Sequence, residues 1–301
     1  MRSLPPINAI SSLERLSMAA KIGLVMEGGA MRGMFTAGVI DVFMENGVDF
    51  AAAVGVSAGA AFGCNIKSRQ IGRVIRYNKK YCADKRFCSV ESLMKTGDLY
   101  GADFCYREIP EELDIFDKEE FERNPMEFYV VCTDVLTGEP VYHRLDKVDD
   151  ECYEWMRASA SMPMVSRPVS VGGRILLDGG MSDSIPLLFM QRLGFERNVV
   201  ILTQPRSYVK EPSNKLLLRV GLADYPAMIK VMEDRHIMYR CERDYVFECE
   251  KRGDTFVICP DDYLPVKHTE HDPEKLQAAY DEGRRTALRE LEAVKEFISA
   301  L

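Results

Sequence analysis

A serine set between two glycines, where an apolar run meets an alanine-rich run, constrains the fold of this chain more than any other feature. Ser57 lies between Gly55 and Gly59. Residues 50–54 predict a short buried strand, and residues 60–66 predict the tightly packed start of a helix. A sharp turn between them places the serine hydroxyl at a helix N-terminus, where the helix dipole and free N–H groups favour negative charge. The sequence therefore predicts a nucleophile elbow; a glycine-rich turn with a solvated serine is the alternative.

A glycine-rich loop precedes this turn. Residues 22–26 predict a buried strand, residues 27–33 read Glu-Gly-Gly-Ala-Met-Arg-Gly, and apolar residues then recur at helical spacing as far as residue 47. Such a loop turns the backbone and points N–H groups outward, as an oxyanion hole requires. The donors expected there are the N–H groups of Gly28, Gly29 and Ala30. Phosphate binding is the alternative, but the glycine spacing matches neither a dinucleotide fingerprint nor a P-loop.

A third motif follows farther along the chain. Residues 174–177 predict a short apolar strand that ends in Asp178, Gly179 and Gly180, and Pro186 is placed to open the next helix. Taken alone, this aspartate is a turn signal. Strands near 128–133, 174–177 and 199–203 predict a mostly parallel sheet, and its functional rim is expected where the strands end. Asp178 is therefore expected to face the same rim as Ser57.

Taken together, the glycine loop, the serine turn and the aspartate turn, in this order, resemble the patatin-like phospholipase family. The resemblance covers residues 20–205 and includes Met162-Pro163. It implies an α/β/α fold of three layers around a mostly parallel sheet, with the elbow after the second strand. Two residues depart from the family pattern: Ala30 replaces the third glycine of the loop, and Ser184 replaces an asparagine. Alanine still supplies a backbone N–H, so the departure at Ala30 narrows the conformational freedom of the loop without removing a donor.

The resemblance also implies a mechanism. Ser57 would attack the ester carbonyl of a lipid, Asp178 would take its proton, and the glycine loop would hold the oxyanion. Neither a histidine nor a cofactor is required by this dyad. Arg32, in the same loop, has two interpretations: it orients a headgroup phosphate, or it forms a salt bridge that locks the loop.

Two other functions remain open at this point. A Ser-His-Asp esterase would combine Ser57 and Asp178 with His236, His268 or His271. The early position of the elbow argues against it, because several strands normally precede the elbow in an α/β-hydrolase. The other alternative is a protein that binds a lipid or a nucleotide on this scaffold without catalysis.

Composition limits the remaining classes. With 301 residues and 47% hydrophobic content, the chain is expected to form one domain: a core over 20–205 and a helical extension over 206–301 with a late strand. The net charge of −8 argues against nucleic acid as a partner. Nine cysteines without zinc-type spacing predict a reducing compartment and no metal site. Residues 1–6 lack the apolar run of a signal peptide.

These features predict a cytoplasmic protein that contacts a membrane surface only transiently, if it does so at all. Two segments are candidates for covering the acyl pocket. The turn-rich residues 89–120 predict its rim or cap. Residues 216–249 predict one or two amphipathic helices that pack on the sheet or, alternatively, form a lid.

Overall fold

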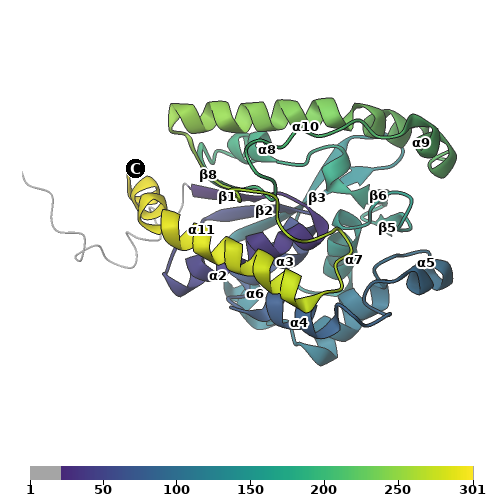
Figure 1. Cartoon of the computed structure of the whole chain (residues 1–301), viewed down its shortest axis with the longest axis horizontal. Helices are drawn as coiled ribbons and strands as arrows, with labels where there is room; N and C mark the ends of the chain where they lie inside the picture. The colour runs from purple at the N-terminus through teal and green to yellow at the C-terminus, as the bar shows by residue number, and fades with distance from the viewer. Residues whose placement is uncertain (1–21, 301) are drawn as a thin grey trace, which may run out of the picture.

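The computed structural model describes residues 22–300 as an α/β fold in which helices cover both faces of a central sheet (Figure 1). The prediction about a signal peptide falls on residues outside this range. Eight strands form the sheet. They are β1 (Ile22–Met26), β2 (Ala52–Val56), β3 (Glu127–Asp134), β4 (Pro140–Arg144), β5 (Val169–Val171), β6 (Arg174–Asp178), β7 (Arg197–Ile201) and β8 (Thr255–Ile258).

Helices connect these strands. The α-helices are α2 (Gly33–Glu45), α3 (Ala58–Lys67), α4 (Arg73–Tyr81), α5 (Val90–Thr96), α6 (Lys118–Arg123), α7 (Asp150–Ser159), α8 (Leu187–Arg192), α9 (Lys215–Gly221), α10 (Pro226–Arg252) and α11 (Pro273–Ser299). Three further helical segments are η2 (Ala30–Arg32), the π-helix η3 (Phe104–Leu113) and η4 (Gly179–Met181). None of the described helices is both long and apolar enough to cross a membrane.

The sheet is parallel at its centre and antiparallel at one edge. Its strand order is β5-β6-β3-β2-β1-β7-β8, and β4 also pairs with β3. The five strands from β3 to β8 are parallel, as expected, whereas β4 and β6 run antiparallel to β3. The strand before Asp178, β6, also runs antiparallel to β5, with which it forms a hairpin through Gly172 and Gly173, which have φ of 57° and 71°. A short hairpin connection allows only antiparallel pairing.

Strands β1 and β2 place the glycine loop and the serine turn side by side. Met26 at the end of β1 pairs with Gly55 of β2. β2 ends at Val56, immediately before Ser57, so it begins and ends two residues later than the predicted strand. Because the two strands are parallel neighbours, the loops that follow them lie at the same edge of the sheet.

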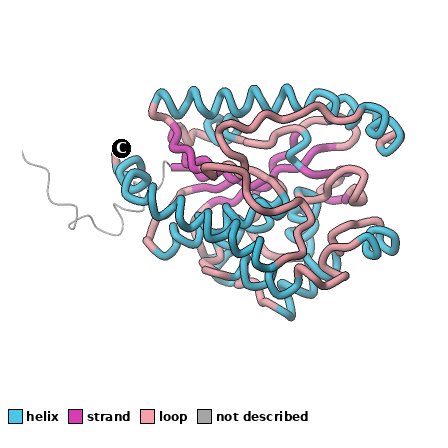
Figure 2. The backbone as a smooth tube through the Cα atoms, viewed as in Figure 1, coloured by secondary structure: helices cyan, strands magenta, loops and turns pink. Residues whose placement is uncertain are grey.

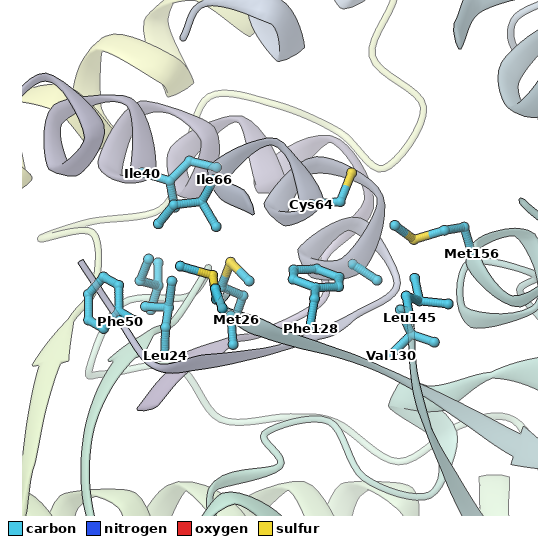
Figure 3. Close-up of a cluster of buried hydrophobic side chains, with 14 of the residues drawn as sticks. Leu24, Met26, Ile40, Phe50, Cys64, Ile66, Phe128, Val130, Leu145 and Met156 are labelled. Atoms are coloured by element: carbon cyan, nitrogen blue, oxygen red, sulfur yellow. The ribbon is translucent and has the colours of Figure 1, made fainter. Parts of the chain in front are cut away.

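Alternate strand residues pack against opposite helical layers. Leu24 and Met26 belong to the core formed with α2, α3, α7 and α11, as Figure 3 shows for the labelled side chains. Val25 faces the other way, into the core formed with α8 and α10. Figure 2 shows the strands between these two layers of helices. The three-layer arrangement therefore follows from the two-residue period of buried strands.

The C-terminal region adds both to the sheet and to its cover. β8 pairs with β7 at one edge, α10 lies along one face, and α11 packs on α2 (Figure 1). Gly38 of α2 meets Gly283 of α11, where a Cβ atom on either residue would overlap the opposite backbone. Whether residues 1–301 form a single domain stays a prediction.

Candidate active site

The serine turn is a strand-to-helix elbow with a strained backbone. Ser57 follows β2, caps α3 and has φ 55° and ψ −120°. A positive φ is rare for a residue with a side chain and persists where the surrounding structure enforces it. A Cβ atom at Gly55 would overlap the backbone of Gly59, and one at Gly59 would overlap the carbonyl of Met26. Close backbone contacts therefore require both glycines.

Strand register brings Ser57 and Asp178 together across β3. Val56 pairs with Val131, so Ser57 comes level with Cys132, and Asp178 pairs with the same Cys132 from the other side. Asp178 is 3% exposed and Ser57 9%. Burial raises the pKa of Asp178, and the neighbouring Ser57 side chain is the largest effect opposing that rise. A hydroxyl therefore lies beside a carboxyl group of raised pKa, an arrangement suited to proton transfer.

Backbone contacts fix the turn that carries Asp178. Its Oδ1 accepts a 2.8 Å hydrogen bond from the N–H of Gly180, and its own N–H donates to the carbonyl of Ser161 at 2.8 Å. The Thr133 hydroxyl donates a 2.9 Å hydrogen bond to the carbonyl of Asp178. Arg235 donates from Nε to the carbonyl of Gly180 at 2.6 Å, and its charge lowers the pKa of Asp178. The aspartate is thus held at both its backbone and its side chain.

The glycine loop lies directly against Ser57. A Cβ atom on Gly28 would be 3.0 Å from the Cβ atom of Ser57. Ala30 has φ 49°, in the left-handed region that favours glycine, at the loop position where it departs from the family pattern. Within residues 22–300, the N–H groups of Gly28, Gly29 and Ala30 have no hydrogen-bond acceptor. These donors are therefore free to bind an oxygen atom of a ligand.

A buried glutamate supports this loop from behind. Glu27 is 3% exposed, and its Oε2 accepts a 2.5 Å hydrogen bond from the N–H of Thr203, while its Oε1 accepts one of 2.5 Å from the Tyr239 hydroxyl. The Thr203 hydroxyl also donates to the carbonyl of Gly28 at 2.9 Å. Because the N–H of a trans peptide points away from its carbonyl, this bond turns the N–H of Gly29 away from Thr203.

Arg32 contacts a histidine and no carboxylate among the described residues. Its Nη1 lies 2.9 Å from Nε2 of His268. Burial, followed by the charge of Arg32, lowers the pKa of His268 to about 4, so the imidazole is neutral near pH 7 and accepts this hydrogen bond. The salt bridge considered for Arg32 is therefore replaced by a charged hydrogen bond to a neutral ring.

The histidines lie apart from the dyad. Across residues 22–300, no histidine forms a hydrogen bond with Ser57 or Asp178; His271 contacts the carbonyl of Cys82 at 2.6 Å, and His236 lies within α10. No group of three or more His, Cys, Asp or Glu side chains in the same range is arranged to hold a metal ion.

An apolar cavity opens from Ser57. It is lined by Ala30 and Ser57 at the site and by aromatic and aliphatic side chains beyond, including Phe62, Phe116 and Met156. The predicted cap segment, residues 89–120, contributes further lining residues. They are Tyr100, Cys105, Tyr106, Ile109, Pro110 and Phe116. Ser57 therefore borders a space that suits a hydrocarbon chain.

Several residues that organise the site carry no motif. Ser159 accepts a hydrogen bond from the N–H of Ser57, while Thr203 and Tyr239 hold Glu27. Arg235 lies in α10, within the residues 216–249 that the sequence pattern assigns to amphipathic helices. The strand end at Thr203 is a weak signal for a site residue, and no spacing rule relates the other three to the dyad.

Two family models match separate stretches of the chain, and a solved structure aligns with most of it. A family model described as patatin-like phospholipase matches residues 24–190, and one described as a domain of unknown function (DUF6363) matches residues 225–299. A crystal structure of VipD from Legionella pneumophila aligns with a TM-score of 0.46 at 14% identity, over 91% of this chain and 67% of that chain.

Curated relatives have moderate similarity. The uncharacterized protein YjjU of Escherichia coli is 28% identical over 80% of this chain and 68% of its own length. The uncharacterized NTE family protein Mb1092c of Mycobacterium bovis is 26% identical over 58% and 46%. Lysophospholipase NTE1 of Debaryomyces hansenii is 27% identical, over 62% of this chain and 12% of its own. This chain therefore spans about two thirds of the first relative and less than half of the other two.

The family model that covers the glycine loop, the serine elbow and the aspartate turn spans more than half of the chain. This protein belongs to the patatin-like phospholipase family.

Proposed function

We propose that this protein is a serine acyl hydrolase that cleaves carboxyl esters of lipids, as a phospholipase A or lysophospholipase does. The observation that carries the proposal is the strained Ser57 elbow beside buried Asp178, on the wall of an apolar cavity. The name of the yeast relative, a lysophospholipase, agrees with this substrate class.

In the proposed reaction, the Ser57 oxygen attacks the ester carbonyl while Asp178 takes the hydroxyl proton. The raised pKa of Asp178 makes it a stronger base than an ordinary aspartate. The free N–H groups of Gly28, Gly29 and Ala30 bind the oxyanion of the tetrahedral intermediate. Asp178 then returns the proton to the leaving alcohol, and water hydrolyses the acyl-Ser57 ester by the same steps.

The alternatives explain fewer of the contacts. A Ser-His-Asp esterase would require a histidine on Ser57, whereas His268 is engaged by Arg32 and His271 by the carbonyl of Cys82. A non-catalytic lipid-binding or nucleotide-binding protein would not require a strained serine beside a carboxyl group of raised pKa. Backbone strain at Ser57 and a raised pKa at the adjacent Asp178 are features that cluster at catalytic sites.

For the cellular setting we propose the cytoplasm, with transient contact at a membrane surface when the enzyme takes a lipid. All nine cysteines are free thiols, which fits a reducing compartment. No cofactor takes part in the proposed reaction.

A fluorophosphonate tests the nucleophile. After incubation with the full chain, intact-mass spectrometry and peptide mapping should find one adduct, on Ser57, because the reagent mimics the tetrahedral intermediate. Ser57→Ala should take no label, whereas Ser68→Ala, at the opposite end of α3, should label like the wild type. A folded wild-type protein that takes no label, or takes it elsewhere, contradicts the proposal.

A further inference from the structure

Two arginines flank the Ser57 and Asp178 pair. Nη2 of Arg32 lies 3.2 Å from the position that a Cβ atom on Gly29 would take, so this guanidinium borders the glycine loop. Nη2 of Arg235 lies 3.4 Å from the corresponding position on Gly180, which is itself 3.1 Å from Oδ1 of Asp178. One guanidinium therefore borders each of the two loops that form the site.

Lys210 adds a third cation to this region. Its Nζ lies 5.4 Å from the centre of the Tyr239 ring, and the hydroxyl of that ring holds Glu27 behind the glycine loop. Burial and the charges of Arg235 and Arg32 lower the pKa of Lys210 to about 8. Below that pH the lysine is charged.

Carboxylates compensate this cluster only in part: the charge of Asp178 acts to raise the pKa of Arg235, and that of Glu27 acts to raise the pKa of Lys210. Within residues 22–300, Arg32, Lys210 and Arg235 form no salt bridge, although arginines elsewhere on the surface form many. Nε of Arg32 is buried and has no hydrogen-bond partner among these residues. The three cations outnumber these two acids, so an anion from outside the chain would stabilise the cluster further.

The acids near the cluster also accept hydrogen bonds from neutral groups, which hold them away from direct ion pairs with the three cations. Glu27 accepts hydrogen bonds from Thr203 and Tyr239, and Asp178 accepts one from Gly180. The third acid, Glu242, interacts electrostatically with Arg235. Burial and the neighbouring Asp183 raise the pKa of Glu242, however, and so favour its uncharged form. His268, in contact with Arg32, is neutral near pH 7 because its pKa is lowered to about 4.

We propose that Arg32, Lys210 and Arg235 bind the phosphate of a lipid headgroup and make the enzyme prefer acyl esters with a net negative headgroup over zwitterionic or neutral ones. This specificity rests on the proposed hydrolase function. Guanidinium groups suit phosphate because they donate two parallel hydrogen bonds. A choline group would instead need free aromatic faces, and the Tyr239 ring already carries the Lys210 ammonium.

The site would give the C-terminal region a chemical role. The patatin-like model ends at residue 190, so only Arg32 of the three cations lies within it. Arg235 lies in the region that matches a domain of unknown function, residues 225–299, and Lys210 lies between the two matched stretches. We infer that the region after residue 205 supplies headgroup selection to a hydrolytic centre built by the region before it.

The test compares three substrates with the same acyl chain: lysophosphatidic acid, lysophosphatidylcholine and monoacylglycerol, each in neutral detergent micelles. The wild type should hydrolyse lysophosphatidic acid with a kcat/KM about tenfold above that for the other two, as for a charge-assisted contact. Lys210→Gln should remove most of this ratio, and Lys210→Arg should restore it. Lys215→Gln, an exposed lysine on α9, is the matched control and should keep the wild-type ratio.

A binding measurement separates this inference from the hydrolase proposal. Calorimetric titration of Ser57→Ala with lysophosphatidic acid, glycerol 3-phosphate and inorganic phosphate needs no turnover. Tighter binding of lysophosphatidic acid than of the other two, weakened about tenfold by adding Lys210→Gln, supports the site even if no ester is cleaved. Equal kcat/KM for the three lipids overturns the preference. Inorganic phosphate binding as tightly as the lipid also overturns the headgroup assignment, in favour of a free-phosphate site.

Discussion

The backbone N–H of Ser57 donates a 3.0 Å hydrogen bond to Oγ of Ser159, a residue at the end of α7. The Ser159 hydroxyl in turn donates to the carbonyl of Val131 in β3 at 2.7 Å. Ser159 is fully buried, so water cannot replace either contact. One hydroxyl therefore ties the strained elbow both to the helix before the aspartate hairpin and to the strand that separates Ser57 from Asp178.

Replacing this hydroxyl should loosen the elbow. In Ser159→Ala the buried N–H of Ser57 loses its acceptor, which costs about 1–3 kcal/mol of unfolding free energy. We expect kcat/KM for a lipid ester to fall at least tenfold while the shape of its pH profile is retained, because Asp178 is untouched. Urea unfolding and an ester assay measure the two effects. Ser161→Ala, which removes a hydroxyl bonded to the Arg157 carbonyl, is the control; full activity in Ser159→Ala would refute the positioning role.

Ala30 offers a way to stabilise the glycine loop. A left-handed conformation costs a residue with a Cβ atom about 1–2 kcal/mol, and glycine avoids it at an entropic cost of about 0.5–1 kcal/mol. Ala30→Gly should therefore raise the free energy of unfolding by up to about 1 kcal/mol in urea titrations and retain esterase activity. Ala37→Gly, in the buried interior of α2, should lower it by about 1 kcal/mol or more. A destabilised Ala30→Gly would show that the positive φ carries no strain.

The raised pKa of Asp178 predicts the acid limb of activity. Only the ionised carboxylate accepts the Ser57 proton, so kcat/KM should fall as pH decreases through a value above 3.8, the ordinary pKa of aspartate. Hydrolysis of a neutral short-chain ester between pH 4 and 8 measures this midpoint without titrating the substrate. A midpoint at or below 3.8 would mean that burial does not govern this group.

The same burial predicts a stability gain when the charge is removed. Below pH 3.8 Asp178 is protonated in both the folded and unfolded states; as pH rises, the unfolded chain loses its proton first and folding is disfavoured. Asp178→Asn should thus be inactive yet more resistant to urea than the wild type at pH 7, with a smaller difference at pH 4.5. An inactive variant that is also less stable at pH 7 would indicate a mainly structural role for the carboxylate.

Lys210 should show the corresponding behaviour of a buried cation. Its pKa, lowered to about 8, means that the charged form disfavours folding below pH 8, and that wild-type stability rises as pH increases above 8. Lys210→Gln should therefore raise the melting temperature at pH 7 in phosphate-free buffer, and the gain should shrink by pH 10. Lys215→Gln, which changes an exposed lysine, should shift it little at either pH.

The sequence predicts the parts of the site that local backbone contacts determine. The elbow at Ser57 and the loop at Gly28 are signalled by glycines that close contacts require, and such requirements can be read within a few residues. The order of the three motifs also pointed to the patatin-like family, which the family model confirms. The roles assigned to the individual residues remain to be measured.

The direction of β6 lay beyond that reasoning. An apolar strand followed by Asp-Gly-Gly looks the same in a parallel and in an antiparallel sheet. The two adjacent glycines at 172 and 173 signal only the hairpin between β5 and β6, because left-handed residues between two short strands favour a hairpin. The register of that hairpin against Cys132, which aligns Asp178 with Ser57, depends on long-range pairing that no local pattern encodes.

Arg235 shows a second limit. Its helix is rich in charged residues, and helical periodicity cannot tell a cation that faces solvent from one that reaches a carbonyl of another loop. Arg235 contacts Gly180, which is 55 residues away in the sequence. A contact of this kind can be identified only from the position of α10 relative to the sheet.

The meeting of Gly38 and Gly283 limits how this family member can diverge. A larger residue at either position would collide with main-chain atoms, not with a side chain. A second substitution on the facing helix therefore cannot create room for the larger residue. In most protein cores a paired substitution can compensate for a change of side-chain size, but at these two positions it cannot. Since α2 begins at the end of the glycine loop, lineages that keep this loop in place are expected to keep both glycines or to change the crossing of the two helices altogether.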